Sequence, residues 1–162
     1  MTTKEIMQFQ DVTFAYEGGK VVLNKVNLQL FEGKTYALVG PTGGGKTTTA
    51  SLMARLYDPT SGKVEFENQD IRCFSAQELA KSIGFILQEP FLFSGTVGDN
   101  LRYGNAEISQ VEDATLEKNL QDLGSEKMIS MFENALQTEV SANSENISLG
   151  QKQLISFVVI II

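Results

Sequence analysis

Apolar and polar residues alternate through the first thirty positions of the chain, a period typical of half-buried β-strands. The alternation runs from Met7 to Leu30 and is interrupted at 17–20, where two glycines favour a turn. We therefore predict an antiparallel hairpin over this region. A second, shorter hairpin is predicted over 64–71, around a polar turn at 68–70.

Other apolar segments change the period from that of strands to that of helices. Compact apolar runs at 35–39 and 85–87 predict two buried strands. Apolar residues at helical spacing predict a helix over 46–57. Pro59 and Gly62 end that helix, because neither residue continues a helix well.

Helices dominate the chain from about Ser94 onward. Capping boxes, in which a serine and a glutamate three residues later satisfy each other's backbone donors, predict helix starts at 75–78 and 109–112. The later helices are predicted over 96–103, 109–123 and 126–136. The final residues, 158–162, are all β-branched, which favours a buried parallel strand over a helix end. The pattern as a whole predicts a mixed α/β part followed by a helical part.

Composition narrows the function classes. The 162 residues favour one domain, and 42% hydrophobic with 20% charged residues exclude disorder and a disulfide scaffold. The net charge of −7 has the wrong sign for a protein that grips a nucleic-acid backbone, so we expect no nucleic-acid partner. The chain has no histidine, which excludes His-based catalysis within it, and its single cysteine, Cys73, cannot form an internal disulfide.

Neither a secretory signal nor a membrane span is predicted. The N-terminal residues carry no apolar run after their charges, and no run approaches the roughly 18 apolar residues of a span. From the residues alone we expect a soluble, intracellular domain.

The strongest chemical signal is a glycine-rich segment between the strand predicted over 35–39 and the helix predicted over 46–57. It consists of Gly40, Pro41, Thr42, Gly43, Gly44, Gly45, Lys46 and Thr47. This matches G-x-x-x-x-G-K-[ST] in the strand–loop–helix context of a P-loop. We expect backbone N–H groups to surround a nucleotide's phosphates, Lys46 to reach the β- and γ-phosphates, and the Thr47 hydroxyl to bind Mg²⁺. A glycine turn that merely joins a strand to a helix is the alternative.

Further motifs lie on either side of this loop. Residues 12–16 read Val-Thr-Phe-Ala-Tyr, Gln88 ends a predicted strand, and residues 147–151 read Ile-Ser-Leu-Gly-Gln. In this order they resemble the A-loop, Q-loop and a degenerate signature of the ATP-binding cassette (ABC) transporter family. Three more stretches resemble its exporter subgroup, at 88–97, 99–101 and 138–140. The resemblance covers essentially the whole chain and is far more specific than the P-loop alone.

The resemblance implies an α/β fold: a P-loop NTPase (RecA-like) core with an N-terminal antiparallel β subdomain and a helical subdomain. The implied boundaries are 1–93 for the β subdomain and core, 94–148 for the helical subdomain, and 149–162 for the signature helix and the start of the returning core. ATP and Mg²⁺ are the implied cofactors. A second nucleotide-binding domain and transmembrane domains are the implied partners, at the cytoplasmic face of a membrane.

The resemblance also implies roles for single residues. Tyr16 would stack on adenine, Lys46 and Gln88 would be catalytic, and Thr47 and Gln88 would bind Mg²⁺. The other implied nucleotide contacts are Gly40, Pro41, Thr42, Gly43, Gly44, Gly45, Thr48, Ser148, Gly150 and Gln151. The last three would face the γ-phosphate of ATP held by the opposite subunit, in a head-to-tail dimer. Leu149 departs from the family, which most often has glycine there.

Each of these roles has a plainer alternative in the residues themselves. Tyr16 could pack in the sheet, Gln88 could be a polar strand end, and Ser148 could simply cap a helix. The apolar segment 91–93 is either core or a surface that meets the transmembrane partner.

Three parts of the family pattern are absent from the 162 residues: a strand ending in Asp-Glu, the D-loop that follows it, and a switch histidine. The Asp would support Mg²⁺ and the Glu would polarise the attacking water. We therefore expect a chain cut short within the domain, with 158–162 as the apolar part of the acidic-motif strand. The leading function is the ATP-hydrolysing engine of a membrane exporter, although this chain alone is expected to be inactive or very weak. A non-hydrolysing ATP-binding module is the second interpretation, and a small-molecule kinase is a weaker third.

Overall fold

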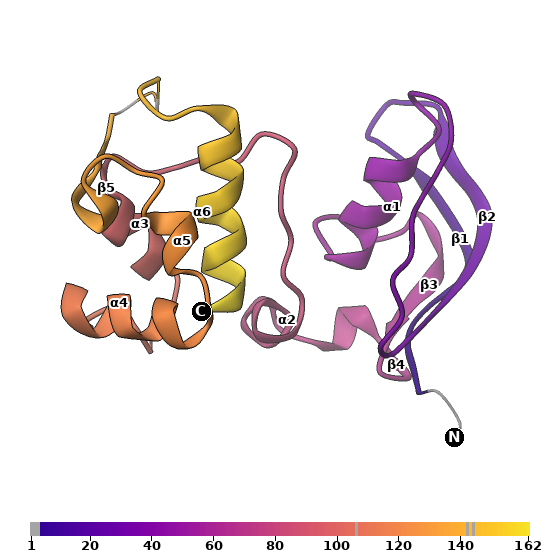
Figure 1. Ribbon diagram of the computed structural model, residues 1–162. Helices are drawn as coiled ribbons and strands as arrows, with labels where there is room; N and C mark the ends of the chain where they lie inside the picture. The colour runs from indigo at the N-terminus through magenta and orange to yellow at the C-terminus, as the bar shows by residue number, and fades with distance from the viewer. Residues whose placement is uncertain (1–3, 106, 142, 144) are drawn as a thin grey trace. The chain divides into compact units, whose positions relative to one another are not determined.

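The computed structural model describes residues 4–105, 107–141, 143 and 145–162 (Figure 1). The chain forms two compact units, one extending to Gly84 and the other running from Phe85 to Ile162. The first is built on an antiparallel sheet and the second mainly on helices.

The sheet of the first unit has four antiparallel strands. They are β1 (Glu5–Ala15), β2 (Val21–Phe31), β3 (Ser61–Phe66) and β4 (Gln69–Asp70), in the order β2-β1-β3-β4. Both predicted hairpins are confirmed, although the turn of the second lies at 67–68 and not at 68–70. Phe9 on the central strand β1 pairs with Leu28 of β2 and Val64 of β3. The second turn lies at Glu67 and Asn68, whose φ angles of 49° and 65° are left-handed, as tight hairpin turns require.

A hydrophobic core joins the sheet to helix α1 (Lys46–Met53). Phe9 and Leu52 are almost wholly buried in it. The helix ends four residues before the predicted position. The short helices η1 (Ile71–Cys73) and α2 (Ala76–Ser82) complete the unit. The capping box of α2 is confirmed by reciprocal bonds between Ser75 and Glu78, which join each backbone N–H to the other's side chain at 2.7 and 3.2 Å.

Two strand predictions were wrong. Residues 35–39 and 85–87 have no regular secondary structure, and Val39 is 89% exposed. A strand must hydrogen-bond to a neighbouring strand, and neither sheet in the described part of the chain includes these segments. Apolar runs alone therefore did not decide the structure here.

The second unit packs its helices around one core, with a two-stranded ribbon at its edge. The ribbon pairs β5 (Gly95–Thr96) with β6 (Glu139–Val140). The helices are α3 (Val97–Arg102), α4 (Asp113–Asp122), α5 (Glu126–Ile129), η2 (Ala135–Gln137) and α6 (Leu149–Ile161). α3 confirms the helix predicted over 96–103. α6 is the longest helix of this unit, and α3 packs against it (Figure 1).

Three predictions in this unit need correction. α4 begins at Asp113, with Glu112 as an N-cap residue that makes no side-chain cap bond, so the capping box predicted at 109–112 is wrong. The helix predicted over 126–136 is divided into α5 and η2. Residues 158–161 continue α6 and do not form a strand. Ile155 and Val158 are wholly buried on one face of that helix, so tertiary packing outweighs the weak helix propensity of β-branched residues.

Candidate functional site

The glycine loop at 40–47 closes around its own lysine. The Lys46 ammonium donates hydrogen bonds to the carbonyl oxygens of Gly40 and Pro41, at 3.0 and 2.8 Å. The Gly44 N–H donates back to the Pro41 carbonyl at 3.1 Å, which tightens the loop into a turn. The positive charge of Lys46 is thus held directly over the loop backbone.

Gly43 and Gly45 allow the loop to take this path. Their φ angles are +77° and +82°, a left-handed conformation that side chains rarely tolerate. At Gly45 a Cβ would also lie 2.7 Å from Leu23 Cδ2, so both the backbone conformation and the neighbouring side chain require glycine at this position. Gly45 is the N-cap residue of α1 and offers no side chain to its first turn. The free N–H groups of that turn, together with the helix dipole, favour an anion.

Tyr16 lies beside the start of α1. Its phenol oxygen is 3.1 Å from the Thr48 hydroxyl, and Thr48 itself is buried. Its ring meets Phe14 and Tyr57 edge to face, with ring centroids 4.9 and 5.3 Å away. Tyr16 remains 40% exposed, so part of its ring is accessible to a ligand. The structure brings together Tyr16, Thr48 and the glycine loop, while Thr47 is exposed on the first turn of α1.

The second unit carries Gln88 and the residues 147–151. Ser148 caps α6 through a full capping box: its hydroxyl accepts from the Gln151 N–H at 3.2 Å, and the Gln151 side chain accepts from the Ser148 N–H at 3.0 Å. The helix-cap interpretation of Ser148 is therefore confirmed. Leu149 is half exposed, and a Cβ on Gly150 would have no atom within 4 Å, so this helix start has an open surface.

Gln88 and α6 are linked by a bond that the sequence did not predict. The Gln153 side-chain amide donates to the Gln88 carbonyl oxygen at 3.1 Å. The Gln88 residue itself is exposed. Glutamine occurs at both 151 and 153, and only Gln151 fits the capping box. The presence of Gln153 was the one feature of the sequence that could have pointed to this hydrogen bond.

The apolar segment 91–93 divides between core and surface. Leu92 is buried, whereas Phe91 is 72% exposed and Phe93 stacks on the exposed Tyr103 with ring centroids 3.8 Å apart. Asn100 holds this segment: its side chain accepts from the Phe93 N–H at 2.8 Å and donates to the Phe93 carbonyl at 2.9 Å. The core interpretation is correct for Leu92 and wrong for the two phenylalanines.

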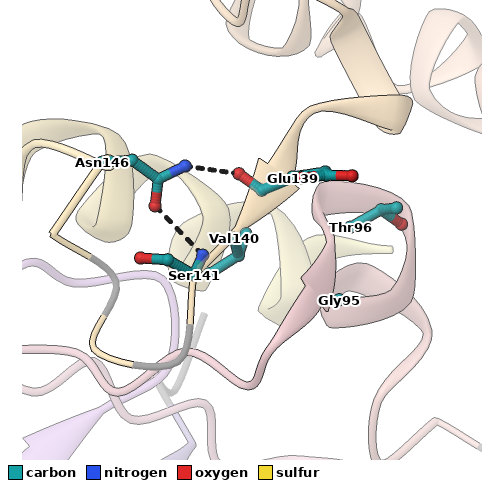
Figure 2. A pocket seen from close by; sticks show the side chains of 6 residues that line it. All are labelled: Gly95, Thr96, Glu139, Val140, Ser141 and Asn146. Carbon is teal, nitrogen blue, oxygen red and sulfur yellow. Dashed lines mark hydrogen bonds between the residues drawn. The ribbon is translucent and has the colours of Figure 1, made fainter.

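Two of the exporter-type stretches meet at a pocket of about 290 Å³ (Figure 2). It is lined by Gly95, Thr96, Glu139, Val140, Ser141 and Asn146. Asn146 bridges the strand end, since its amide donates to the Glu139 carbonyl at 2.6 Å and its oxygen accepts from the Ser141 N–H at 3.0 Å. Both strands of the ribbon thus line the same pocket as Asn146, which comes just before the signature residues.

Charged groups outside this region form local pairs. The Arg102 guanidinium holds the pKa of Asp113 below its usual range, and the Arg72 guanidinium does the same for the pKa of Asp70. Across the described residues, no group of three or more Asp, Glu or Cys side chains is arranged to hold a metal ion. Nor does any helix of that part have the length and apolar character that crossing a bilayer demands.

The sequence matches a known protein family and several of its members. Residues 23–162 match the ABC transporter family. The chain is 38% identical over 150 residues to the uncharacterized ABC transporter ATP-binding protein YfiC of Bacillus subtilis, covering 93% of this chain and 24% of that protein. It is 35% identical over 152 residues to a fatty acid ABC transporter ATP-binding/permease protein of Mycobacterium bovis, covering 93% of this chain and 23% of that protein.

A solved structure supports the same assignment. The bacterial Atm1-family ABC exporter with ATP bound superposes with a TM-score of 0.81 at 27% identity, over 99% of this chain and 28% of that one. The chain spans about a quarter of the length of these relatives. The predicted α/β P-loop fold class is therefore confirmed, because it is the fold class of this family. The chain belongs to the ABC transporter family, as an ATP-binding domain of the exporter type.

Proposed function

We propose that this chain is the ATP-binding and ATP-hydrolysing domain of a membrane exporter. The observation that carries the proposal is the glycine loop, whose lysine ammonium and uncapped helix start converge at one place. Such a concentration of donors and positive charge is suited to a triphosphate. Because the chain as a whole has a net charge of −7, an anionic ligand is favoured at this loop and not over the protein surface in general.

ATP would bind across the first unit. The adenine would stack on the exposed ring of Tyr16, a contact that tolerates any base but favours none strongly. The phosphates would meet the backbone N–H groups of 40–48, with Lys46 neutralising the β- and γ-phosphates. Lys46 would then exchange the carbonyls of Gly40 and Pro41 for phosphate oxygens. The Thr48 hydroxyl, now shared with Tyr16, would lie at the edge of the same site.

Oxygen donors fit Mg²⁺, which prefers hard ligands and retains waters when it binds a nucleotide. The Thr47 hydroxyl is exposed on the first turn of α1, where it could serve as such a ligand. The Gln88 side-chain oxygen is the second protein ligand that we propose, with a further role in orienting the attacking water. When bound, Mg²⁺ would neutralise charge that develops on the phosphates.

A second copy of the domain would complete the site. Ser148, Gly150 and Gln151 would face the γ-phosphate of ATP held by that copy, in a head-to-tail dimer. The open surface over Gly150 and the free donors of the first turn of α6 support this proposal. ATP binding would close the dimer and hydrolysis would reopen it.

Transmembrane domains would convert this motion into outward transport of a substrate. The exposed Phe91 and Phe93 offer an apolar surface for that partner. The domain would then lie at the cytoplasmic face of a membrane. The subdomain boundaries 1–93, 94–148 and 149–162 form part of the same proposal.

Steady-state phosphate release tests the proposal on the full 162-residue chain. Multiple turnovers of ATP, abolished in Lys46→Ala, would support hydrolysis at the glycine loop. Nucleotide binding without turnover would instead favour the second function, a non-hydrolysing ATP-binding module. The observation that favours this second function is that the 162 residues contain no histidine and no Asp-Glu pair. Because these groups are absent from the 162 residues, the turnover that we expect from this polypeptide alone is weak, and its loss in Lys46→Ala decides between the two functions.

A further inference from the structure

We propose that Tyr57 is a positioning residue for the nucleotide base, because it sets the plane of the Tyr16 ring. The inference rests on the proposed function, in which the base stacks on Tyr16. Tyr57 follows the end of α1 and lies outside the glycine loop and the other sequence motifs.

Three aromatic rings form a cluster beside the glycine loop. The Tyr16 and Tyr57 rings are perpendicular, at 90°, with centroids 5.3 Å apart. Phe14 lies edge to face with Tyr16, at 4.9 Å and 85°, and tilted against Tyr57, at 5.6 Å and 51°. Phe14 is 4% exposed, whereas Tyr57 is 47% exposed. Phe14 is thus the buried member of the cluster, and the two tyrosines contact it from the protein surface.

The bond from Tyr16 to Thr48 leaves one degree of freedom open. The phenol oxygen lies on the axis about which the ring rotates, so the hydrogen bond at 3.1 Å fixes the direction of that axis. It does not fix the plane of the ring about the axis. That plane is set by the perpendicular contacts with Phe14 and Tyr57. Since stacking depends on the ring face, Tyr57 controls whether Tyr16 presents that face to a base.

The contribution of Tyr57 to binding can be measured apart from that of the phosphate site. Removing the Tyr57 ring takes away one of the two contacts that set the Tyr16 plane, but it leaves the glycine loop and Lys46 untouched. We expect Tyr57→Leu to weaken ATP binding about 3- to 10-fold, the range that one aromatic pair contributes. Binding of inorganic tripolyphosphate, which has no base, should stay unchanged.

Titration calorimetry on the full chain tests this with ATP and tripolyphosphate as the two probes. Tyr57→Phe, which keeps the ring, should restore the preference for ATP. The matched control is Tyr36→Leu, which removes a tyrosine of similar exposure whose hydroxyl accepts from the Phe31 N–H. This control should leave the affinities for both probes unchanged.

The possible failures are distinguishable. If the wild-type chain binds ATP no better than tripolyphosphate, the proposed base site fails. If Tyr16→Leu reduces the preference for ATP but Tyr57→Leu does not, the inference on Tyr57 is wrong and the proposed function stands. Equal weakening of both probes by Tyr57→Leu would reveal a merely structural role and would also overturn the inference.

A measurement on the wild-type chain covers the case in which Tyr57→Leu does not fold. With ¹³C-labelled tyrosine, ATP should shift the ring signals of Tyr16 and Tyr57 together, and tripolyphosphate should not. The ring signal of Tyr36 serves as the internal reference. A shift confined to Tyr16 would contradict the coupling between the two rings.

Discussion

The side-chain amide of Gln153 donates a hydrogen bond to the backbone carbonyl of Gln88, 65 positions earlier in the chain, at 3.1 Å. Gln88 lies in an irregular segment, whereas Gln153 lies on α6, the helix that begins at the signature residues. An exposed hydrogen bond therefore joins the Gln88 segment to α6.

We predict that Gln153→Ala loosens the Q-loop segment without unfolding the domain. A hydrogen bond contributes about 0.5–1.5 kcal/mol to the free energy of unfolding, so global stability should change little. Hydrogen exchange measured by mass spectrometry should show faster exchange in a peptide covering 85–93. Gln121→Ala, which removes an exposed glutamine from α4, is the matched control and should leave that peptide unchanged. Equal exchange in wild type and Gln153→Ala would contradict the tether.

A second prediction separates two roles of Ser148. Ser148→Ala should destabilise the domain by about 1 kcal/mol in urea unfolding, because the hydroxyl that accepts from Gln151 is lost. Ser148→Asp should retain nearly full stability, since aspartate caps helices as well as serine does.

The same Ser148→Asp variant tests the proposed dimer. A carboxylate near a γ-phosphate would be repelled, so ATP-dependent dimerisation in analytical ultracentrifugation should weaken about tenfold or more. If the Asp variant dimerises as the wild type does, Ser148 has only its capping role. If Ser148→Ala is as stable as wild type, the cap contributes less than its geometry implies.

The glycine loop offers a third prediction through two matched variants. Gly43→Ala and Gly45→Ala both force alanine into a left-handed conformation, which costs about 1–2 kcal/mol. At Gly43 the new Cβ has no atom within 4 Å, whereas at Gly45 it meets Leu23 Cδ2 at 2.7 Å. Crowding a buried leucine adds roughly 1–3 kcal/mol.

Urea unfolding should therefore rank the stabilities as wild type, then Gly43→Ala, then Gly45→Ala. Nucleotide affinity should fall in both variants, because both distort the loop backbone. Equal stabilities of the two variants would mean that Leu23 relaxes freely, and that Gly45 is confined by its φ angle alone.

The elements that the sequence predicted well are those whose signals are local. The hairpin of β1 and β2 depends on alternation, and the capping boxes at Ser75 and Ser148 depend on residues three positions apart. The family assignment was also confirmed, because the motifs are separated and ordered. Sequence reasoning was therefore sufficient for the fold class and for the loop that binds phosphate in the proposal.

The elements that failed depend on distant partners. An apolar run such as 35–39 becomes a strand only if a neighbouring strand pairs with it, and no periodicity reveals that neighbour. Residues 158–161 were misassigned because Val158 packs into a helical core that outweighs its own preference. Tyr57 and Gln153 were missed for the same reason, since their contacts with Tyr16 and Gln88 join separated parts of the chain.

The last prediction concerns Asp113, whose carboxylate accepts hydrogen bonds from Arg102 and Gln137. The Arg102 side chain also donates to the Val111 carbonyl at 2.8 Å, which fixes the guanidinium in place. The bond from Arg102 holds the pKa of Asp113 below its usual range; burial opposes this effect and Gln137 supports it. Because the folded-state pKa is lowered, folding favours the ionised carboxylate.

The resulting stabilisation is fully present above the unfolded-state pKa, near pH 4, and is lost as the pH falls through the lower folded-state pKa. Asp113→Asn should therefore be less stable than wild type at pH 6, by at most about 1 kcal/mol because the pair is partly exposed to solvent. The difference should shrink as the pH drops toward 2. Urea unfolding between pH 2 and pH 7 measures it, with Arg102→Gln as the companion variant that removes the same pH-dependent term from the other side. A difference between wild type and Asp113→Asn that stays constant across this range would mean that Asp113 stabilises the unit through packing, not through its charge.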